Sequence, residues 1–161
     1  MIKDKACIVG IGETAYCRKP GSGMSDDALQ LRAAMAALED AGLKGRQVDG
    51  LLAFPNVGKC EVFAASLGCE NLRFAATIHM GGASPVASLR MAAMAGVSGP
   101  AAHVLIPAGW TGFSGRRMAE DVSTDKAASP GGAIAWDYYL PQGLTAPPQW
   151  YALMARRHMH E

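Results

Sequence analysis

The sequence predicts an α/β fold with layers of helices against a mostly parallel sheet. Over the first 109 residues, short apolar runs alternate with segments of helical periodicity, and glycine or proline separates them. Such alternation is typical of parallel strands joined by helices. One segment, 85–96, is apolar on nearly every side. The chain has 161 residues, half of them hydrophobic, which is enough for a packed core.

Four apolar runs are predicted strands, at 6–11, 48–54, 72–78 and 101–108. The first is apolar throughout, which is typical of a strand buried on both faces. Between the first two strands, Ser25 is a predicted helix N-cap, and Gly42 is a predicted stop. Leu31, Met35 and Leu38 recur at helical spacing between them. A shorter helix is predicted at 61–67, ending at Gly68.

The stretch at 77–96 is a predicted strand end, a glycine pair and a helix. Ser84 has the chemistry of an N-cap, and Pro85 suits the first helical position. Only Ser88 and Arg90 interrupt the apolar residues of 85–96, so we expect this helix to be buried. A buried helix N-terminus beside Gly81 offers amide groups to a carbonyl oxygen, an oxyanion or a phosphate.

Composition narrows the class of protein. A net charge of +1 favours neither a nucleic-acid partner nor an acidic membrane surface, and no apolar run is long enough to span a bilayer. The N-terminus leads into a strand pattern without a signal-peptide core, which predicts a cytoplasmic protein without membrane insertion. The four cysteines form no CxxC pair and are expected to be reduced and mostly buried. No metal site is predicted, because His158 and His160 do not share a helical face.

After residue 109 the composition changes, and aromatic residues are spread among glycine, proline and serine. We therefore divide the chain into an α/β core at 1–109 and a loop region at 110–161. A last helix is predicted to begin near Gln149 and looks truncated at Glu161, because no glycine stop follows. Tyr138 and Tyr139 could donate protons, although packing suits them better.

The segments 8–14, 29–43 and 48–51, the turn at 81–85 and the helix at 151–161 together resemble the thiolase superfamily. Within it, the chain is most similar to the sterol-carrier, lipid-transfer-protein-like branch, and it resembles the N-terminal half only. The resemblance implies a layered fold whose helix 85–96 lies between two sheets. It also implies a coenzyme A thioester as substrate, without a tightly bound cofactor.

The nucleophilic cysteine of thiolases is missing from the turn. Aligning Ser84 with the family's serine places Gly82 at the nucleophile position, and no cysteine follows Cys69. The resemblance then implies either an acyltransferase or a retro-aldol carbon–carbon lyase of lipid or sterol degradation. The alternative is a non-catalytic subunit that binds acyl-CoA or lipid, or that supports a second thiolase-like chain.

The candidate site residues follow from this resemblance and from the residue types. Ser84 is a cap, or else a nucleophile or oxyanion donor. His79 is a hydrogen-bonded strand end, or else a general base. The backbone of the turn Gly81, Gly82 and Ala83 is expected to approach the ligand, and the pair Arg116 and Arg117 is either a solvated surface pair or a phosphate contact. The expected partners are acyl-CoA and either a second copy, paired through the strand at 73–78, or an accessory chain.

Overall fold

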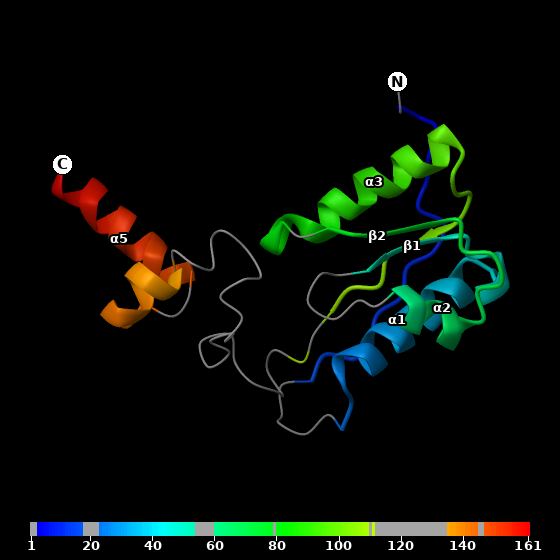
Figure 1. Cartoon of the computed structure of the whole chain (residues 1–161), viewed down its shortest axis with the longest axis horizontal. Coiled ribbons are helices and arrows are strands. Elements are labelled where there is room, and N and C mark those ends of the chain that lie inside the picture. The colour runs from blue at the N-terminus through cyan, green and yellow to red at the C-terminus, as the bar shows by residue number, and fades with distance from the viewer. Residues whose placement is uncertain are drawn as a thin grey trace. The chain divides into compact units, whose positions relative to one another are not determined.

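The computed structural model describes residues 3–17, 23–53, 60–78, 80–109, 111, 135–144 and 147–161. The chain divides into two compact units, 1–111 and 112–161, and each is described by itself. Figure 1 shows the helices and strands of both units.

The first unit is built on a parallel three-stranded sheet in the order β2-β1-β3. The strands are β1 (Gly50–Ala53), β2 (Phe74–Thr77) and β3 (Val104–Leu105), and Gly50 lies opposite both Phe74 and Val104. Helices α1 (Asp26–Asp40) and α2 (Cys60–Leu67) lie on one face of the sheet and α3 (Ser84–Ser98) on the other (Figure 1). Three of the four predicted strands are confirmed, although each is shorter than its apolar run, and β2 is at an edge of the sheet.

Local signals set the bounds of α1 and α2. The Ser25 hydroxyl accepts a hydrogen bond from the Ala28 amide at 3.2 Å, which confirms the predicted N-cap. Gly42 has a φ of +66° and ends α1, and the Leu43 amide then donates to the Leu38 carbonyl at 2.8 Å. Gly68, with a φ of +68°, ends α2 in the same way. These positive φ values favour glycine, so both predicted stops are confirmed.

The core of this unit lies between the sheet and the two helices on the first face. Phe63 of α2 packs with Leu38, Val48 and Leu51, and all four are buried. Burial of these four large apolar side chains holds α1 and α2 against the sheet, because each contributes about 1.5–3 kcal/mol to the free energy of folding.

Asp49 joins all three strands at their amino ends. Its carbonyl accepts hydrogen bonds from the amides of Arg73 and Phe74, and its own amide donates to the His103 carbonyl. Its carboxylate accepts from the Ala102 amide at 2.9 Å and the His103 amide at 2.7 Å. One residue therefore fixes where β2 and β3 begin relative to β1.

The pKa of Asp49 reflects these contacts. Partial burial opposes ionisation, but the hydrogen bonds from the Ala102 and His103 amides outweigh it, and the pKa lies below its ordinary value of 3.8. The neighbouring Asp49 amide and the charge of His103 act in the same direction.

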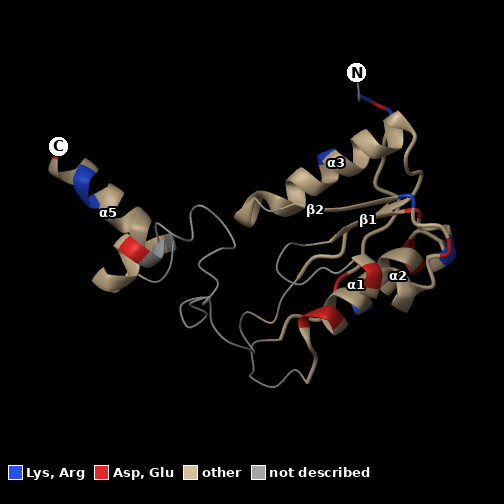
Figure 2. Cartoon of the chain, in the orientation of Figure 1, with Lys and Arg blue, Asp and Glu red and all other residues tan. Residues whose placement is uncertain are grey.

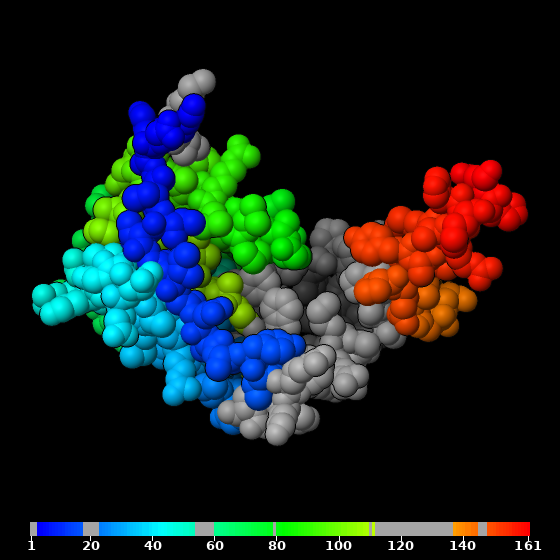
Figure 3. Space-filling model, turned by 180° about the vertical axis from the view of Figure 1, so that it is seen from behind, coloured from blue at the N-terminus to red at the C-terminus, as the bar shows by residue number. Residues whose placement is uncertain are grey.

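The predicted strand at 6–11 is wrong. These residues are extended without strand pairing, and Ile8, Val9 and Ile11 are 66%, 59% and 74% exposed instead of buried. Figure 3 shows the segment lying along the surface of the unit. The Ile11 amide donates to the Asp40 carboxylate of α1 at 2.8 Å, so a side chain, and not a neighbouring strand, receives it.

Two glycines hold this N-terminal segment close to α1. A Cβ on Gly10 would lie 2.3 Å from the Ala37 carbonyl oxygen, and one on Gly12 would lie 2.2 Å from the Ala33 carbonyl oxygen. The backbone of the segment therefore contacts the backbone of α1 at positions where only glycine fits.

The expectation of a buried helix at 85–96 is also wrong for this chain. α3 extends over Ser84–Ser98, and only Ser84, Ser88 and Ala95 are buried. Val86, Leu89, Met94 and Val97 are each more than a third exposed. Figure 2 shows one charged position on the helix, which the sequence identifies as Arg90. The sheet covers one face of α3, and no second layer covers the other face among the described residues.

The amino end of α1 holds the chain that leaves β3. The Gln30 side-chain amide, 1% exposed, donates to the Gly109 carbonyl at 2.7 Å, and the Asp26 carboxylate accepts from the Thr111 amide. The carbonyl and amide groups on either side of residue 110 are therefore bound to the first two turns of one helix.

The second unit contains two short turns of helix, 135–139 and 140–142, and α5 (Pro147–His160). Tyr139 stacks on Trp150 with 5.2 Å between ring centroids, and the Trp150 indole donates to the Leu144 carbonyl at 3.4 Å. Tyr139 thus packs, as expected, whereas Tyr138 is 71% exposed, against the same expectation. Arg157 pairs with Glu161 at 2.6 Å on the exposed end of α5.

Candidate functional site

The glycine-rich turn that follows β2 is the strongest candidate site. A single 3₁₀ turn at Gly81–Ala83 leads directly into α3, with Ser84 as the first residue of the α-helix. The Ala83 amide donates to the Met80 carbonyl at 3.1 Å, and the Ser84 amide donates to the Gly81 carbonyl. Both of these amides therefore donate within the turn. The amides of Gly81 and Gly82 are the remaining candidates for contact with a ligand.

Ser84 is not the N-cap of α3, which corrects the sequence-based expectation. Its backbone is already helical, and Ala83 precedes the helix. The Ser84 hydroxyl reaches backwards and accepts a hydrogen bond from the Met80 amide at 2.8 Å. The side chain is fully buried, at 0% exposure. A hydroxyl in this position stabilises the turn, and a substrate carbonyl cannot approach it without displacing the turn.

Gly81 and Gly82 leave the outer side of the turn open. A Cβ on either residue would have no heavy atom within 4 Å, so space lies beside both. Gly81 has a φ of +54°, which glycine adopts without strain. The turn thus presents backbone to open space at the amino end of a fifteen-residue helix, where the helix dipole favours negative charge.

The structure leaves three expected site residues undescribed. His79, Arg116 and Arg117 lie outside the described residues, so their proposed roles stay predictions. The turn lies at the carboxyl end of β2, and residues 106–109 leave the carboxyl end of β3 at the same edge of the sheet (Figure 1). Ligands of open parallel α/β sheets bind at this edge.

The cysteines divide into two pairs. Cys7 and Cys17 are exposed, against the expectation of mostly buried thiols, because the N-terminal segment lies on the surface. Cys60 places its sulfur 3.8 Å from the Leu51 and Ala76 carbonyl oxygens. Burial raises the pKa of the Cys69 thiol, which disfavours the thiolate that a nucleophile requires.

Two further findings concern metal binding and membrane spans. Within the described ranges, no group of three or more His, Cys, Asp or Glu side chains is arranged to hold a metal ion. No helix in that part of the chain is long and apolar enough to cross a membrane.

Sequence reasoning missed the anchors on either side of the turn. Met80 supplies the amide that fixes Ser84, and Gln30 fixes the chain after β3. Gln30, Ala34 and Leu38 are the buried residues of α1 and recur at four-residue spacing, which was a usable signal for Gln30, since buried polar side chains need partners. Nothing in the local sequence distinguishes Met80.

No protein-family model matches the sequence. A steroid side-chain-cleaving aldolase from Thermomonospora curvata is 34% identical over 157 residues, which cover 97% of this chain and 40% of that protein. A 17-hydroxy-3-oxo-4-pregnene-20-carboxyl-CoA lyase from Mycobacterium tuberculosis is 36% identical over 163 residues, covering 99% of this chain and 41% of that protein. The chain therefore spans about two fifths of the length of these relatives.

A solved structure described as an Ltp2-ChsH2(DUF35) aldolase superposes with a TM-score of 0.77 and 34% identity, covering 95% of this chain and 37% of that one. A 3-oxoacyl-[acyl-carrier-protein] synthase III from Aquifex aeolicus reaches a TM-score of 0.49 at 21% identity, covering 55% of this chain and 30% of that one. The chain is thus similar to carbon–carbon lyases of steroid side-chain cleavage, one of which acts on a CoA thioester. Neither sequence relative carries the name of an acyltransferase.

Proposed function

We propose that this chain is the N-terminal part of an acyl-CoA lyase that cleaves a steroid side chain by a retro-aldol reaction. The observation that carries the proposal is the similarity to a side-chain-cleaving aldolase and a CoA lyase along nearly the whole chain. The turn fits this chemistry because it lacks a cysteine for acyl transfer and offers backbone amides beside open space.

The reaction needs a stabilised enolate. A base removes the proton of the β-hydroxyl group, the bond between the α- and β-carbons breaks, and the β-carbon becomes a ketone. The electron pair of that bond moves to the α-carbon and onto the thioester oxygen, and a proton then adds to the α-carbon. The amides of Gly81 and Gly82, with the dipole of α3 behind them, would stabilise the negative thioester oxygen.

Other groups complete the proposed site. His79 precedes Gly81 by two positions in the sequence and would act as the base. Arg116 or Arg117 would bind a phosphate of coenzyme A. Ser84 would position the turn through Met80 without contacting the thioester. The relatives are longer than this chain. Further catalytic groups would come from the part of their length, more than half, that this chain does not cover.

We also propose partners. The exposed apolar side of α3 would be covered by more polypeptide, either from the same gene or from an accessory chain such as the second protein named in the Ltp2-ChsH2 structure. The edge strand β2 would pair with its copy across a two-fold axis. The alternative function, a non-catalytic acyl-CoA-binding subunit, would keep these surfaces without turnover.

A matched pair of variants tests the role of the turn. Gly82→Pro removes one amide N–H within the 3₁₀ turn. Gly82→Ala keeps the N–H and places its Cβ in open space. With 17-hydroxy-3-oxo-4-pregnene-20-carboxyl-CoA as substrate, we expect Gly82→Pro to lower kcat about a hundredfold and Gly82→Ala to have little effect. Equal rates for the two variants would remove the amide from the mechanism.

A further inference from the structure

A cavity of about 840 Å³ lies beside α3, between the N-terminal segment, α1 and the chain that forms and follows β3. We infer that this cavity receives the apolar ring system of the thioester substrate. The inference rests on the proposed function and extends it from the thioester to the rest of the ligand. A cavity of this size falls in the range of about 300–1,000 Å³ that drug-sized ligands occupy.

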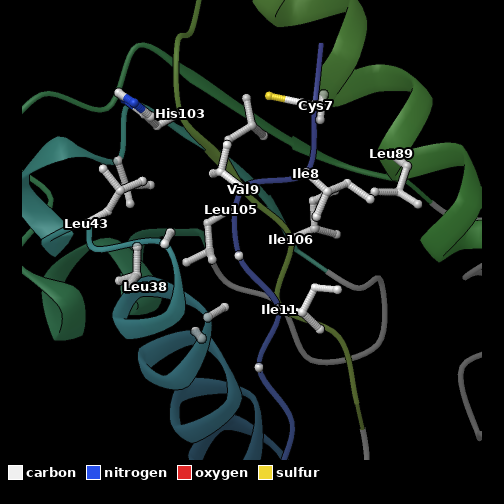
Figure 4. Close-up of a pocket in the computed structure, with 18 of the residues that line it drawn as sticks. Cys7, Ile8, Val9, Ile11, Leu38, Leu43, Leu89, His103, Leu105 and Ile106 are labelled. Carbon is white, nitrogen blue, oxygen red and sulfur yellow. The ribbon is translucent and has the colours of Figure 1, made fainter.

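Most of the side chains that line the cavity are aliphatic. Figure 4 shows Ile8, Val9 and Ile11 from the N-terminal segment, Leu38 from α1, Leu89 from α3, and Ile106 beyond β3 around the space. Alanine and glycine complete the α3 wall at 92, 93 and 96. These small residues leave a smooth surface along which a flat, rigid ring system can lie in van der Waals contact.

The cavity runs along α3 away from the glycine turn. Its α3 wall begins at Leu89, five residues after Ser84, and ends at Gly96. At a rise of about 1.5 Å per residue, the wall starts roughly 8 Å from the turn and continues for roughly 10 Å. Four fused rings are about that long. In the proposed substrate the first ring lies two bonds from the thioester carbon, so with the thioester at the turn the rings begin before Leu89. The far rings would then lie against the first part of this wall, at Leu89, Ala92 and Ala93.

The far end of the cavity is its polar end. Lys5, Cys7 and His103 are among the lining residues, and Figure 4 shows Cys7 and His103 at the end away from Ile11. A ketone oxygen can accept a hydrogen bond from an ammonium or imidazole N–H group. The last ring would thus face the polar end of the cavity, and the rings before it would contact aliphatic carbon.

The cavity is accessible from solvent. Ile8 and Ile11 are 66% and 74% exposed, although both are large and apolar. A ring system seated here would remove water from these side chains, at about 25 cal/mol for each Å² of apolar surface buried. Binding therefore removes the exposed apolar surface that the extended N-terminal segment creates.

The test uses 4-pregnene-3,20-dione, a steroid without coenzyme A, and acetyl-CoA, a thioester without rings. Each is titrated into the full chain by equilibrium dialysis. Ala93→Phe fills the cavity from α3, and Val9→Phe fills it from the opposite wall. Val97→Phe is the matched control, because Val97 is on the same helix but does not line the cavity. Circular dichroism verifies that each variant is folded.

We expect both filling variants to weaken steroid binding at least tenfold, with acetyl-CoA binding unchanged, and Val97→Phe to bind both ligands normally. Steroid affinity equal in the wild type and both filling variants overturns the inference, as does a wild type that binds acetyl-CoA but no steroid. Steroid binding that the filling variants abolish, without acetyl-CoA binding by any variant, supports the cavity and removes the proposed function.

Discussion

Replacing Asp49 by alanine removes the carboxylate that holds the start of β3. The Ala102 and His103 amides then lose their common acceptor, while the backbone hydrogen bonds of residue 49 remain. Hydrogen bonds to charged groups contribute about 1.5–3 kcal/mol each, but these bonds are solvent-exposed and contribute less. Counting about 1 kcal/mol for each amide, Asp49→Ala lowers the free energy of unfolding by about 2 kcal/mol and Tm by roughly 5–10 °C.

The pH dependence separates this contact from other losses. Because the pKa of Asp49 is lowered in the folded protein, its contribution is complete above the ordinary value of 3.8 and is lost as pH falls through the lower folded pKa. An asparagine side chain in its place keeps one oxygen and does not titrate, so Asp49→Asn costs about 1 kcal/mol at neutral pH.

The assay is urea unfolding followed by circular dichroism, at pH 7 and at a series of values below 4. We expect the difference between wild type and Asp49→Asn to shrink as the pH falls. Glu39→Gln is the charge-loss control, since Glu39 is exposed on the last turn of α1. A difference between wild type and Asp49→Asn that stays constant down to the lowest pH would refute the role given to the ionised carboxylate.

Three further outcomes are expected. Gly12→Ala should destabilise the first unit by about 1–3 kcal/mol and speed hydrogen exchange at Ile11, because its Cβ would lie 2.2 Å from the Ala33 carbonyl oxygen, whereas Gly96→Ala, with 3.8 Å of space, should not. Ser84→Ala should cost about 1 kcal/mol through the Met80 amide and leave acyl-CoA binding intact; a covalent adduct on Ser84 with an acyl-CoA analogue would contradict this. Light scattering at micromolar concentration should give a mass above that of the monomer, and Phe74→Asp on edge strand β2 should reduce it; a clean monomer mass for the wild type removes the proposed pairing.

Signals that act over a few residues were readable from the sequence. Ser25, Gly42 and Gly68 mark helix ends because their effects depend on the adjacent turn only. The apolar runs around Leu51 and Ala75 predict strands because both strands are near the core. The alternation of these elements was enough to predict a parallel α/β arrangement.

The failures involve contacts between distant segments. An apolar run at 6–11 has the composition of a strand, but Gly10 and Gly12 contact α1, and Asp40 receives the Ile11 amide. The composition of α3 predicts burial, which requires a second layer that the sequence pattern cannot supply.

The glycine turn was located correctly, but its hydrogen bonds were not. Ser84 followed by Pro85 is a strong local signal for an N-cap, and the 3₁₀ turn moves the helix start by one residue. That shift turns the hydroxyl towards Met80. The turn was therefore predictable as a place on the chain, whereas the hydrogen bond of each group depended on the geometry of that turn.

The hydrogen bonds between α1 and residues 109 and 111 affect how the protein folds during its synthesis. Gln30 and Asp26 find their partners 79 and 85 positions later, so these contacts cannot form on the ribosome until residue 111 has emerged. These two contacts are therefore among the last to form during the synthesis of the first unit. Contacts at such separation slow folding and leave apolar surface uncovered meanwhile. Chaperone dependence during translation is the expected cost of fixing the carboxyl edge of the sheet with the last segment to arrive.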